Sequence, residues 1–242
     1  MNLGERLNIF LLSVTQQKCE PPPRVTGSIQ SEKLVLRHKV GERVGGIPAE
    51  TKVRASQRAR ELLEQQQQWN RAETILGYAP LSGELDVWPL LLEALKEGKR
   101  VFLPRFVGKP LKRFLEPAPG STLPNQGVNQ RALEGGGIYV ACEIKDPEKD
   151  LLIGRFGIRE PETWCAEIDL NRLDFTLVPG VAFDLQGRRL GRGKGFYDRM
   201  LAEVRGTTCG VAFDEQIVGE VPVEPHDTRV NCIVTPTRWI EL

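Results

Sequence analysis

The chain has 242 residues, of which 40% are hydrophobic, and its 33 lysines and arginines nearly balance its 32 aspartates and glutamates. These values are typical of a globular protein with one large α/β domain or two small ones, and they exclude a disordered or fibrous chain. The net charge of +1 argues against general attraction to nucleic acids or membranes, and no apolar stretch approaches the roughly 18 residues of a membrane span.

Residues 1–30 look separate from the remainder of the chain. A short apolar run at residues 9–12 is followed by three consecutive prolines at 21–23. We expect a disordered extension here, followed by a single domain over residues 31–242. An organelle-targeting peptide is the alternative, although the acidic residues and the scarcity of serine and arginine weaken it.

The first elements of the domain are expected to be two helices and a strand. A helix capped by Ser31 should end at Gly45, and a second helix should run from Pro48 to about Gln68. Residues 75–79 then predict a short buried strand.

A helix, a strand and a long loop should follow. Asp86 is expected to cap a leucine-rich helix that Gly98 stops, and the next strand lies within residues 99–104. Residues 107–137 are rich in proline and glycine and predict a long loop.

The second half of the domain again alternates strands with a helix. Residues 138–144 predict a strand that is not parallel to the others, and residues 175–178 predict a buried strand. A helix over 196–204 and strands over 208–213 and 232–235 complete the chain. This alternation predicts an α/β fold, a three-layer α/β/α sandwich with a mostly parallel central sheet.

The cysteines and histidines limit the possible chemistry. The cysteines are scattered and form no Cys-x-x-Cys pair: Cys19, Cys142, Cys165, Cys209 and Cys232. This pattern argues against a disulfide framework or a structural zinc site and favours a reducing, cytoplasmic compartment. Two histidines, His38 and His226, are too few for a histidine-built metal centre.

A glycine-rich basic loop carries the clearest chemical signal. It lies between a strand and a helix and consists of Arg189, Leu190, Gly191, Arg192, Gly193, Lys194 and Gly195. Alternate glycines let a backbone approach a ligand closely, and the following helix start adds its positive dipole end. With three basic side chains, the loop suits a polyphosphate.

Other interpretations of this loop stay open on the residues alone. No Ser or Thr follows Gly193-Lys194, so it is not a Walker A loop, and its glycine spacing is not the Rossmann one. A flexible, charged surface turn would also fit. Asp198, just after Tyr197, could hold Mg²⁺ beside a phosphate or could simply favour the helix dipole.

The segment resembles the 5-formyltetrahydrofolate cyclo-ligase family. The signature of that family is a strand, Pro-Gly, Phe-Asp, a short turn, and then Arg-Leu-Gly-x-Gly-x-Gly-aromatic-Tyr-Asp. It stands here as Val178-Pro179-Gly180, Phe183-Asp184 and residues 189–198. The resemblance extends more thinly over residues 31–227, whereas residues 1–30 have no counterpart.

The resemblance implies roles for particular residues. ATP would contact Lys33, Arg37, Arg189, Leu190, Gly191, Arg192, Gly193, Lys194, Gly195, Phe196 and Tyr197. The folate would contact Glu84, Phe156, Arg192, Lys194, Phe196 and Tyr197. Lys194, Arg192 and Arg189 would be catalytic, and Asp198 and Asp227 would hold Mg²⁺.

Several of these residues have ordinary interpretations without the resemblance. Lys33 and Arg37 share a helix face that could simply be solvated. Glu84 could precede a helix, Phe156 could be a core residue, and Asp227 could belong to a turn. With the resemblance, the Glu84 carboxylate is expected to take two hydrogen bonds from the 2-amino-pyrimidine edge of the pterin.

Three site positions depart from the pattern of some or many relatives, and two of them, Arg192 and Lys194, are larger and more basic than the residues that some relatives use. Phe196 stands where many relatives have Tyr, which removes a hydroxyl group.

The resemblance implies ATP- and Mg²⁺-dependent cyclisation of 5-formyltetrahydrofolate to 5,10-methenyltetrahydrofolate, with release of ADP and phosphate. We expect a monomer in the cytoplasm that binds neither nucleic acid nor membranes. Two other functions stay open: a phosphate-ester or CoA-handling enzyme on a similar scaffold, and an RNA-binding protein that uses the basic loop on phosphates.

Overall fold

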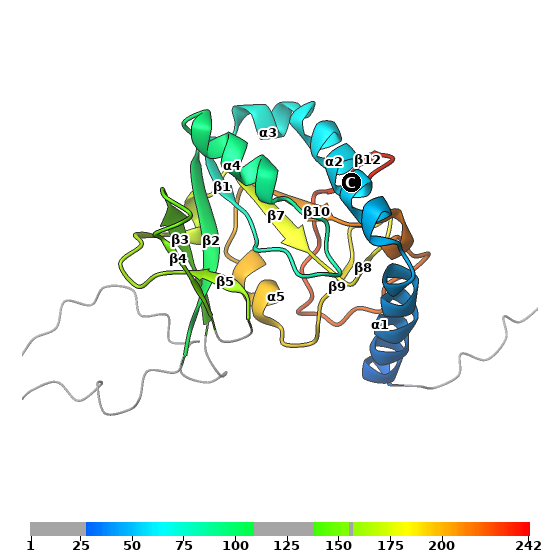
Figure 1. Ribbon diagram of the computed structural model, residues 1–242. Helices are drawn as coiled ribbons and strands as arrows, with labels where there is room; N and C mark the ends of the chain where they lie inside the picture. Colours follow the sequence, from blue (N-terminus) through cyan, green and yellow to red (C-terminus); the bar gives the residue numbers. More distant parts are fainter. Residues whose placement is uncertain (1–27, 109–137, 155–156) are drawn as a thin grey trace, which may run out of the picture.

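The computed structural model describes residues 28–108, 138–154 and 157–242 (Figure 1). The predictions for residues 1–27, for most of the loop up to residue 137 and for Phe156 lie outside the described residues.

An eight-stranded sheet forms the centre of the molecule in the order β12-β11-β10-β7-β1-β2-β3-β6. The parallel strands are β11 (Cys232–Val234), β10 (Thr207–Val211), β7 (Phe175–Pro179), β1 (Thr74–Leu76) and β2 (Arg100–Val107). The antiparallel strands at the edges are β12 (Trp239–Glu241), β3 (Ile138–Ile144) and β6 (Glu167–Ile168). The mostly parallel sheet and the antiparallel 138–144 strand are therefore confirmed.

Helices cover both faces of this sheet, which confirms the three-layer α/β/α prediction (Figure 1). The helices are α1 (Ile29–Gly45), α2 (Ala49–Glu64), α3 (Gln67–Arg71), α4 (Trp88–Lys96) and α5 (Phe196–Leu201), with 3₁₀ turns η3 (Leu170–Arg172) and η4 (Asp214–Gln216). Neighbouring strand residues alternate between two cores: Ile75 packs with α2 and α4, and Leu76 packs with α5.

Two hairpins and α1 lie beside the carboxyl ends of the parallel strands. The hairpins are β4 (Leu151–Ile153) with β5 (Arg159–Pro161), and β8 (Ala182–Phe183) with β9 (Arg189–Leu190). Helix α1 contacts β8 and η4, which follow the ends of β7 and β10. This arrangement brings α1 to the edge of the sheet where ligands bind in α/β folds.

Several predicted helix boundaries were wrong. The first helix begins at Ile29, because the hydroxyl of Ser28, and not that of Ser31, acts as the cap and accepts the Ser31 amide. The second helix ends at Glu64, so the region up to Gln68 contains a break and then α3. The helix predicted over 196–204 already ends at Leu201.

The predicted α4 cap and the first two strands also needed correction. Asp86 accepts the Trp88 amide at 2.9 Å, although Val87 is the backbone cap of α4. The strand expected to reach Ala79 stops at Leu76, and the strand expected to stop at Pro104 continues to Val107, because it pairs with β3 along its whole length.

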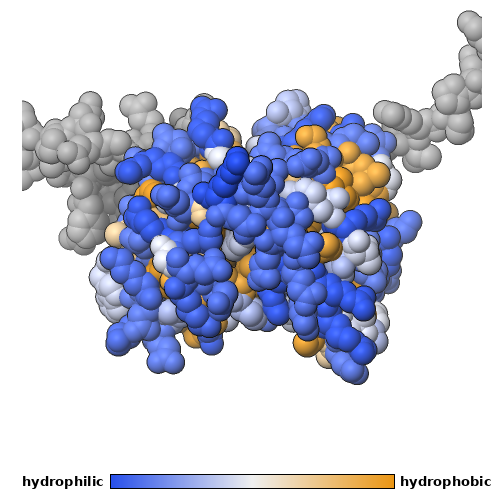
Figure 2. All heavy atoms as spheres, turned by 90° about the horizontal axis from the view of Figure 1, so that it is seen from above, coloured by the Kyte–Doolittle hydropathy of each residue, from blue (hydrophilic) through white to orange (hydrophobic). Residues whose placement is uncertain are grey.

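The surface of the described part is mostly hydrophilic in the view of Figure 2. None of its helices is long and apolar enough to cross a membrane. The four cysteines that it contains, Cys142, Cys165, Cys209 and Cys232, are free and buried.

Candidate active site

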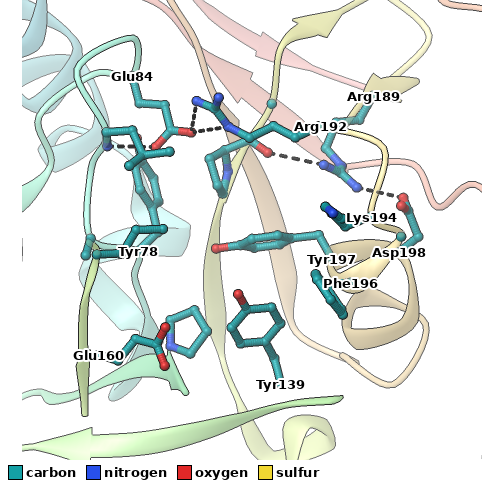
Figure 3. Close-up of a pocket in the computed structure, with 18 of the residues that line it drawn as sticks. Tyr78, Glu84, Tyr139, Glu160, Arg189, Arg192, Lys194, Phe196, Tyr197 and Asp198 are labelled. Carbon is teal, nitrogen blue, oxygen red and sulfur yellow. Dashed lines mark hydrogen bonds and ion pairs between the residues drawn. The ribbon is translucent and has the colours of Figure 1, made fainter. Parts of the chain in front are cut away.

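A cavity of about 340 Å³ opens at the carboxyl ends of β1 and β7 (Figure 3). Tyr78 follows β1, Gly180 follows β7, and the segment from Arg189 to Asp198 forms the facing wall. Parallel strands converge at this edge, so residues far apart in the sequence meet here. The volume suits a small organic ligand.

The glycine-rich loop lies along this wall in a conformation that requires glycine. Gly193 and Gly195 have φ angles of 90° and 63°, which side chains with a Cβ rarely adopt. The Arg37 Nε donates to the Gly191 carbonyl at 2.9 Å, so α1 holds the loop in place. Leu190 is only 1% exposed, its carbonyl accepts the Val181 amide at 2.7 Å, and it does not line the cavity, so the structure places this predicted ATP contact in the core.

Arg189 is a buried cation with an unused donor. Its Nη2 donates to the Asp198 Oδ1 at 2.6 Å, and its Nη1 donates to the Pro179 carbonyl at 3.3 Å. Its Nε is buried without a hydrogen-bond partner, although the side chain is only 2% exposed. A buried guanidinium N–H without a partner is costly, so this group is suited to receive an anionic ligand.

Arg192 forms an ion pair, whereas Lys194 has no partner among the described residues. The Arg192 Nη2 lies 2.9 Å from the Glu84 Oε1, and the second Glu84 oxygen accepts the Leu81 amide at 3.0 Å. The Lys194 ammonium has no ion pair or hydrogen bond within the described ranges, although it lines the cavity. Lys194 is therefore available to bind a negative group.

Aromatic side chains form the apolar part of the cavity. The ring of Phe196 packs edge-to-face against Tyr139 and Phe106, with centroids 5.1 and 5.4 Å apart. The central carbon of the Arg189 guanidinium lies over the Tyr197 ring, 5.7 Å from the centroid of that ring. Burial raises the pKa of the Tyr197 hydroxyl well above its ordinary value of 10, so this group stays neutral.

The sequence analysis missed several residues that line the cavity, among them Tyr78, Tyr139 and Glu160. Tyr78 follows a strand and Tyr139 lies in one, as many aromatic residues do, so the neighbouring sequence gives no sign that they line a site. Glu160 follows Phe156 by four positions in the sequence, in a stretch where the pattern only suggested an aromatic contact.

A second hollow, of about 450 Å³, is lined by Asp227, Glu224 and Arg189, and Lys33 of α1 forms ion pairs with its two carboxylates. The Lys33 Nζ lies 2.6 Å from the Asp227 Oδ2 and 2.9 Å from the Glu224 Oε2. Burial alone would lower the pKa of Lys33, but its hydrogen bonds to these carboxylates outweigh burial and raise it. Burial alone would raise the pKa of Asp227, but the hydrogen bonds from Lys33 and from the Glu224 amide outweigh it and lower it.

The two predicted metal ligands lie in different surroundings. Asp227 belongs to a cluster of possible metal-binding groups with Glu224 and His226, and Asp198 is not part of that cluster among the described residues. One oxygen of each aspartate already pairs with a cation: Asp198 pairs with Arg189, and Asp227 pairs with Lys33. The other oxygen of each carboxylate accepts no hydrogen bond from a described residue, although the His226 Nε2 lies 3.7 Å from the Asp227 Oδ1. The donor set is therefore compatible with a hard divalent cation.

Replacing Lys33 with methionine should lower the free energy of unfolding by about 3 kcal/mol at pH 7, because two partly buried carboxylates lose their partner. The Asp227 contribution is present above its unfolded pKa, near 3.8, and is lost as the pH falls through its lower folded pKa. The Lys33 contribution is lost only as the pH rises through its raised folded pKa, above 10.5.

Urea unfolding of both proteins at neutral and acidic pH measures this effect. The difference between them should shrink below about pH 4. A difference that does not change with pH would mean that Lys33 acts through packing alone.

Comparisons with known proteins relate this chain to one enzyme family. The sequence profile of the 5-formyltetrahydrofolate cyclo-ligase family matches residues 29–236. A 5-formyltetrahydrofolate cyclo-ligase of Mycolicibacterium smegmatis is 35% identical over 170 residues, which cover 69% of this chain and 75% of the relative. The Escherichia coli K12 enzyme of the same name is 32% identical over 171 residues, which cover 69% of this chain and 80% of the relative.

Solved structures show the same relationship. The NMR structure of the Aquifex aeolicus 5,10-methenyltetrahydrofolate synthetase superposes with a TM-score of 0.68 at 31% identity, covering 87% of this chain and 92% of that one. A 5,10-methenyltetrahydrofolate synthetase from Mycoplasma pneumoniae, 19% identical, shares the fold with a TM-score of 0.60, covering 85% of this chain and 99% of that one. The profile match spans most of the chain, and the chain therefore belongs to the 5-formyltetrahydrofolate cyclo-ligase family.

Proposed function

We propose that the protein catalyses the ATP- and Mg²⁺-dependent cyclisation of 5-formyltetrahydrofolate to 5,10-methenyltetrahydrofolate, with release of ADP and phosphate. One observation carries this proposal: the same cavity of about 340 Å³ combines an aromatic wall with a glycine-rich loop that presents the buried Arg189 and Lys194, which has no partner among the described residues. Family membership supports the reaction class.

The proposed reaction has to activate the formyl carbon of the substrate, which is a poor electrophile. The formyl group on N5 is amide-like, so its carbon resists attack and its oxygen is a poor leaving group. Transfer of the γ-phosphoryl group of ATP to that oxygen forms a P–O bond, breaks the bond to ADP and leaves the carbon activated. N10 then attacks this carbon, loses its proton, and the phosphate departs with the former formyl oxygen.

The protein has to align the reactants and neutralise charge, and it needs no side-chain nucleophile. Lys194, Arg192 and Arg189 are proposed to face the transferred phosphoryl group. The remaining ATP contacts are assigned to Lys33 and Arg37 on α1, and to the backbone of the loop through Tyr197. Arg37 already touches the loop, which supports this assignment.

The folate is proposed to occupy the aromatic part of the cavity, beside Phe196 and Tyr197 and within reach of Arg192 and Lys194. Glu84 lies at the end of the cavity near Arg192 and is expected to contact the same substrate. Phe156, outside the described residues, retains the folate role that the resemblance implies. The Tyr139 ring beside Phe196 carries a hydroxyl that could replace the one absent from Phe196.

Asp198 and Asp227 are proposed to hold Mg²⁺, with ATP phosphates and water completing its coordination. When bound, the metal would neutralise the negative charge that accumulates on the phosphates. We further propose that the enzyme acts in the cytoplasm as a monomer. The mostly hydrophilic face seen in Figure 2 supports the monomer, and the four buried, free cysteines among the described residues support the cytoplasm.

The test is an absorbance assay of purified protein with 5-formyltetrahydrofolate, ATP and Mg²⁺. We expect the conjugated methenyl product to accumulate together with ADP, one molecule for each folate converted. ATP hydrolysis that does not depend on the folate would contradict the proposal, and so would salt-sensitive RNA binding without any turnover.

A further inference from the structure

Arg159 lies at the rim of the cavity, on the β4–β5 hairpin. It is the first residue of β5, it is exposed to solvent, and it also lines the cavity. A residue that is both exposed and part of the lining lies where a cavity opens to solvent. Its neighbour Glu160 lies at the opposite end of the cavity from Glu84 (Figure 3), so Arg159 belongs to the β5 end.

The Arg159 guanidinium has no acidic partner in the described part of the chain, in contrast to Arg192, which pairs with Glu84. Its described contact is with Trp88 at the start of α4. The central carbon of the guanidinium lies 5.8 Å from the centroid of the Trp88 ring. A guanidinium that stacks on an aromatic face keeps the N–H donors at its edges available to a ligand.

The charge of Arg159 is isolated from the other cations of the cavity. The glycine-rich loop supplies three of the cations that line it, Arg189, Arg192 and Lys194. Among the described residues, Arg159 is the one cation of the lining that lies outside this loop. Glu160, which is only 8% exposed, places a carboxylate at the same end. Without Arg159, an anionic group leaving the cavity here would meet only like charge.

The orientation of the proposed substrate brings an anionic group to this end. The 2-amino edge of the pterin, expected at Glu84, lies opposite the ring carbon that carries the side chain. That side chain is an aminobenzoyl group ending in glutamate, and it therefore leads away from Glu84 towards β5. The cavity, at about 340 Å³, is near the lower limit of small-molecule sites, so the glutamate extends past its rim.

We propose that Arg159 pairs with a carboxylate of the glutamate tail of 5-formyltetrahydrofolate where the tail leaves the cavity. The inference rests on the proposed function, because it assumes a folate ligand. A guanidinium can donate two parallel hydrogen bonds to one carboxylate, and the Trp88 ring limits the positions that it takes at the rim. Arg159 is thus a specificity residue that favours substrates with the glutamate and does not contact the reacting atoms.

The first experiment compares the kinetics of Arg159→Gln and of the unmodified protein with 5-formyltetrahydrofolate and with 5-formyltetrahydropteroate, which lacks the glutamate. The KM of the unmodified protein should be roughly 3- to 10-fold lower for the folate, a modest effect because the ion pair lies at a solvent-exposed rim. Arg159→Gln should raise the KM for the folate by the same factor and change the KM for the pteroate less than about 1.5-fold.

The values of kcat and of the KM for ATP should change less than about 1.5-fold in Arg159→Gln, because the contact is equally strong before and during phosphoryl transfer. Increasing NaCl should reduce the preference of the unmodified protein for the folate, since salt screens an exposed ion pair. Arg159→Lys keeps the charge but loses the paired donors, so it should retain only part of the preference.

Arg54→Gln is the matched control. Arg54 is an exposed arginine on α2 that pairs with Glu50 at 3.4 Å and does not line the cavity. This variant removes the same charge from the molecule and should leave the KM for both substrates unchanged.

Two results would overturn the inference. An equal rise in the KM for both substrates would mean that Arg159 acts only through its packing on Trp88, and a rise in the KM for ATP alone would mean that it faces the phosphates. Equilibrium titration of the two ligands without ATP measures the preference separately from turnover. The expected preference without any methenyl product would contradict the proposed reaction alone, whereas product formation without the preference would contradict the role of Arg159 alone.

Discussion

Replacing Lys194 with alanine should lower kcat roughly 30- to 1000-fold and should raise the KM for ATP much less. The Lys194 ammonium lines the cavity and has no partner within the described ranges, so its charge is available to the transferred phosphoryl group. That interaction strengthens as negative charge develops, and interactions of this kind act on kcat. Steady-state kinetics at saturating folate measure the effect.

Two further variants make this result specific to Lys194. Lys194→Arg should restore only part of the activity, because a planar guanidinium cannot replace a compact ammonium at a fixed distance. Lys96→Ala removes an exposed lysine that pairs with Glu93 on α4, away from the cavity, and should change the rates less than about twofold. A kcat near that of the unmodified protein for Lys194→Ala would remove Lys194 from the site.

Asp198→Asn should reduce kcat on the order of 100-fold or more and should raise the Mg²⁺ concentration needed for half-maximal activity. It should also lower the free energy of unfolding by about 3 kcal/mol, because the Arg189 guanidinium, 2% exposed, loses its counter-charge at 2.6 Å. The two effects have different causes: the proposed metal contact and the observed ion pair.

Activity and stability of Asp198→Asn measured over a range of Mg²⁺ concentrations separate these causes. If the aspartate holds the metal, high Mg²⁺ should restore part of the activity while the loss of stability without ATP persists. Asp227→Asn should show the same dependence on Mg²⁺. Full activity of Asp198→Asn at low Mg²⁺ would leave this residue only its ion pair with Arg189.

The sequence predicts element types well but their ends poorly. The parallel strands are short buried runs between helices, a pattern that burial on both faces imposes on any such sheet. The ends depend on contacts with other segments. Strand β2 continues to Val107 because β3 pairs with it, and α1 begins at Ile29 because Ser28, and not Ser31, is free to cap it.

What the sequence by itself determined is the fold class and the position of the glycine-rich basic loop, because their signals lie in neighbouring residues. Glycines that need positive φ alternate with basic side chains between a strand and a helix, and this order is visible without any tertiary contact.

Only the tertiary structure decided which charges remain available to a ligand. Lys33 and Asp227 are 194 positions apart in the sequence, and the fold brings the Lys33 Nζ within 2.6 Å of the Asp227 Oδ2. The same folding pairs Arg192 with Glu84 but leaves Lys194 and one Glu160 oxygen without a partner among the described residues. Whether a charged group is paired depends on which distant segments pack against it, and side-chain identity alone does not contain that information.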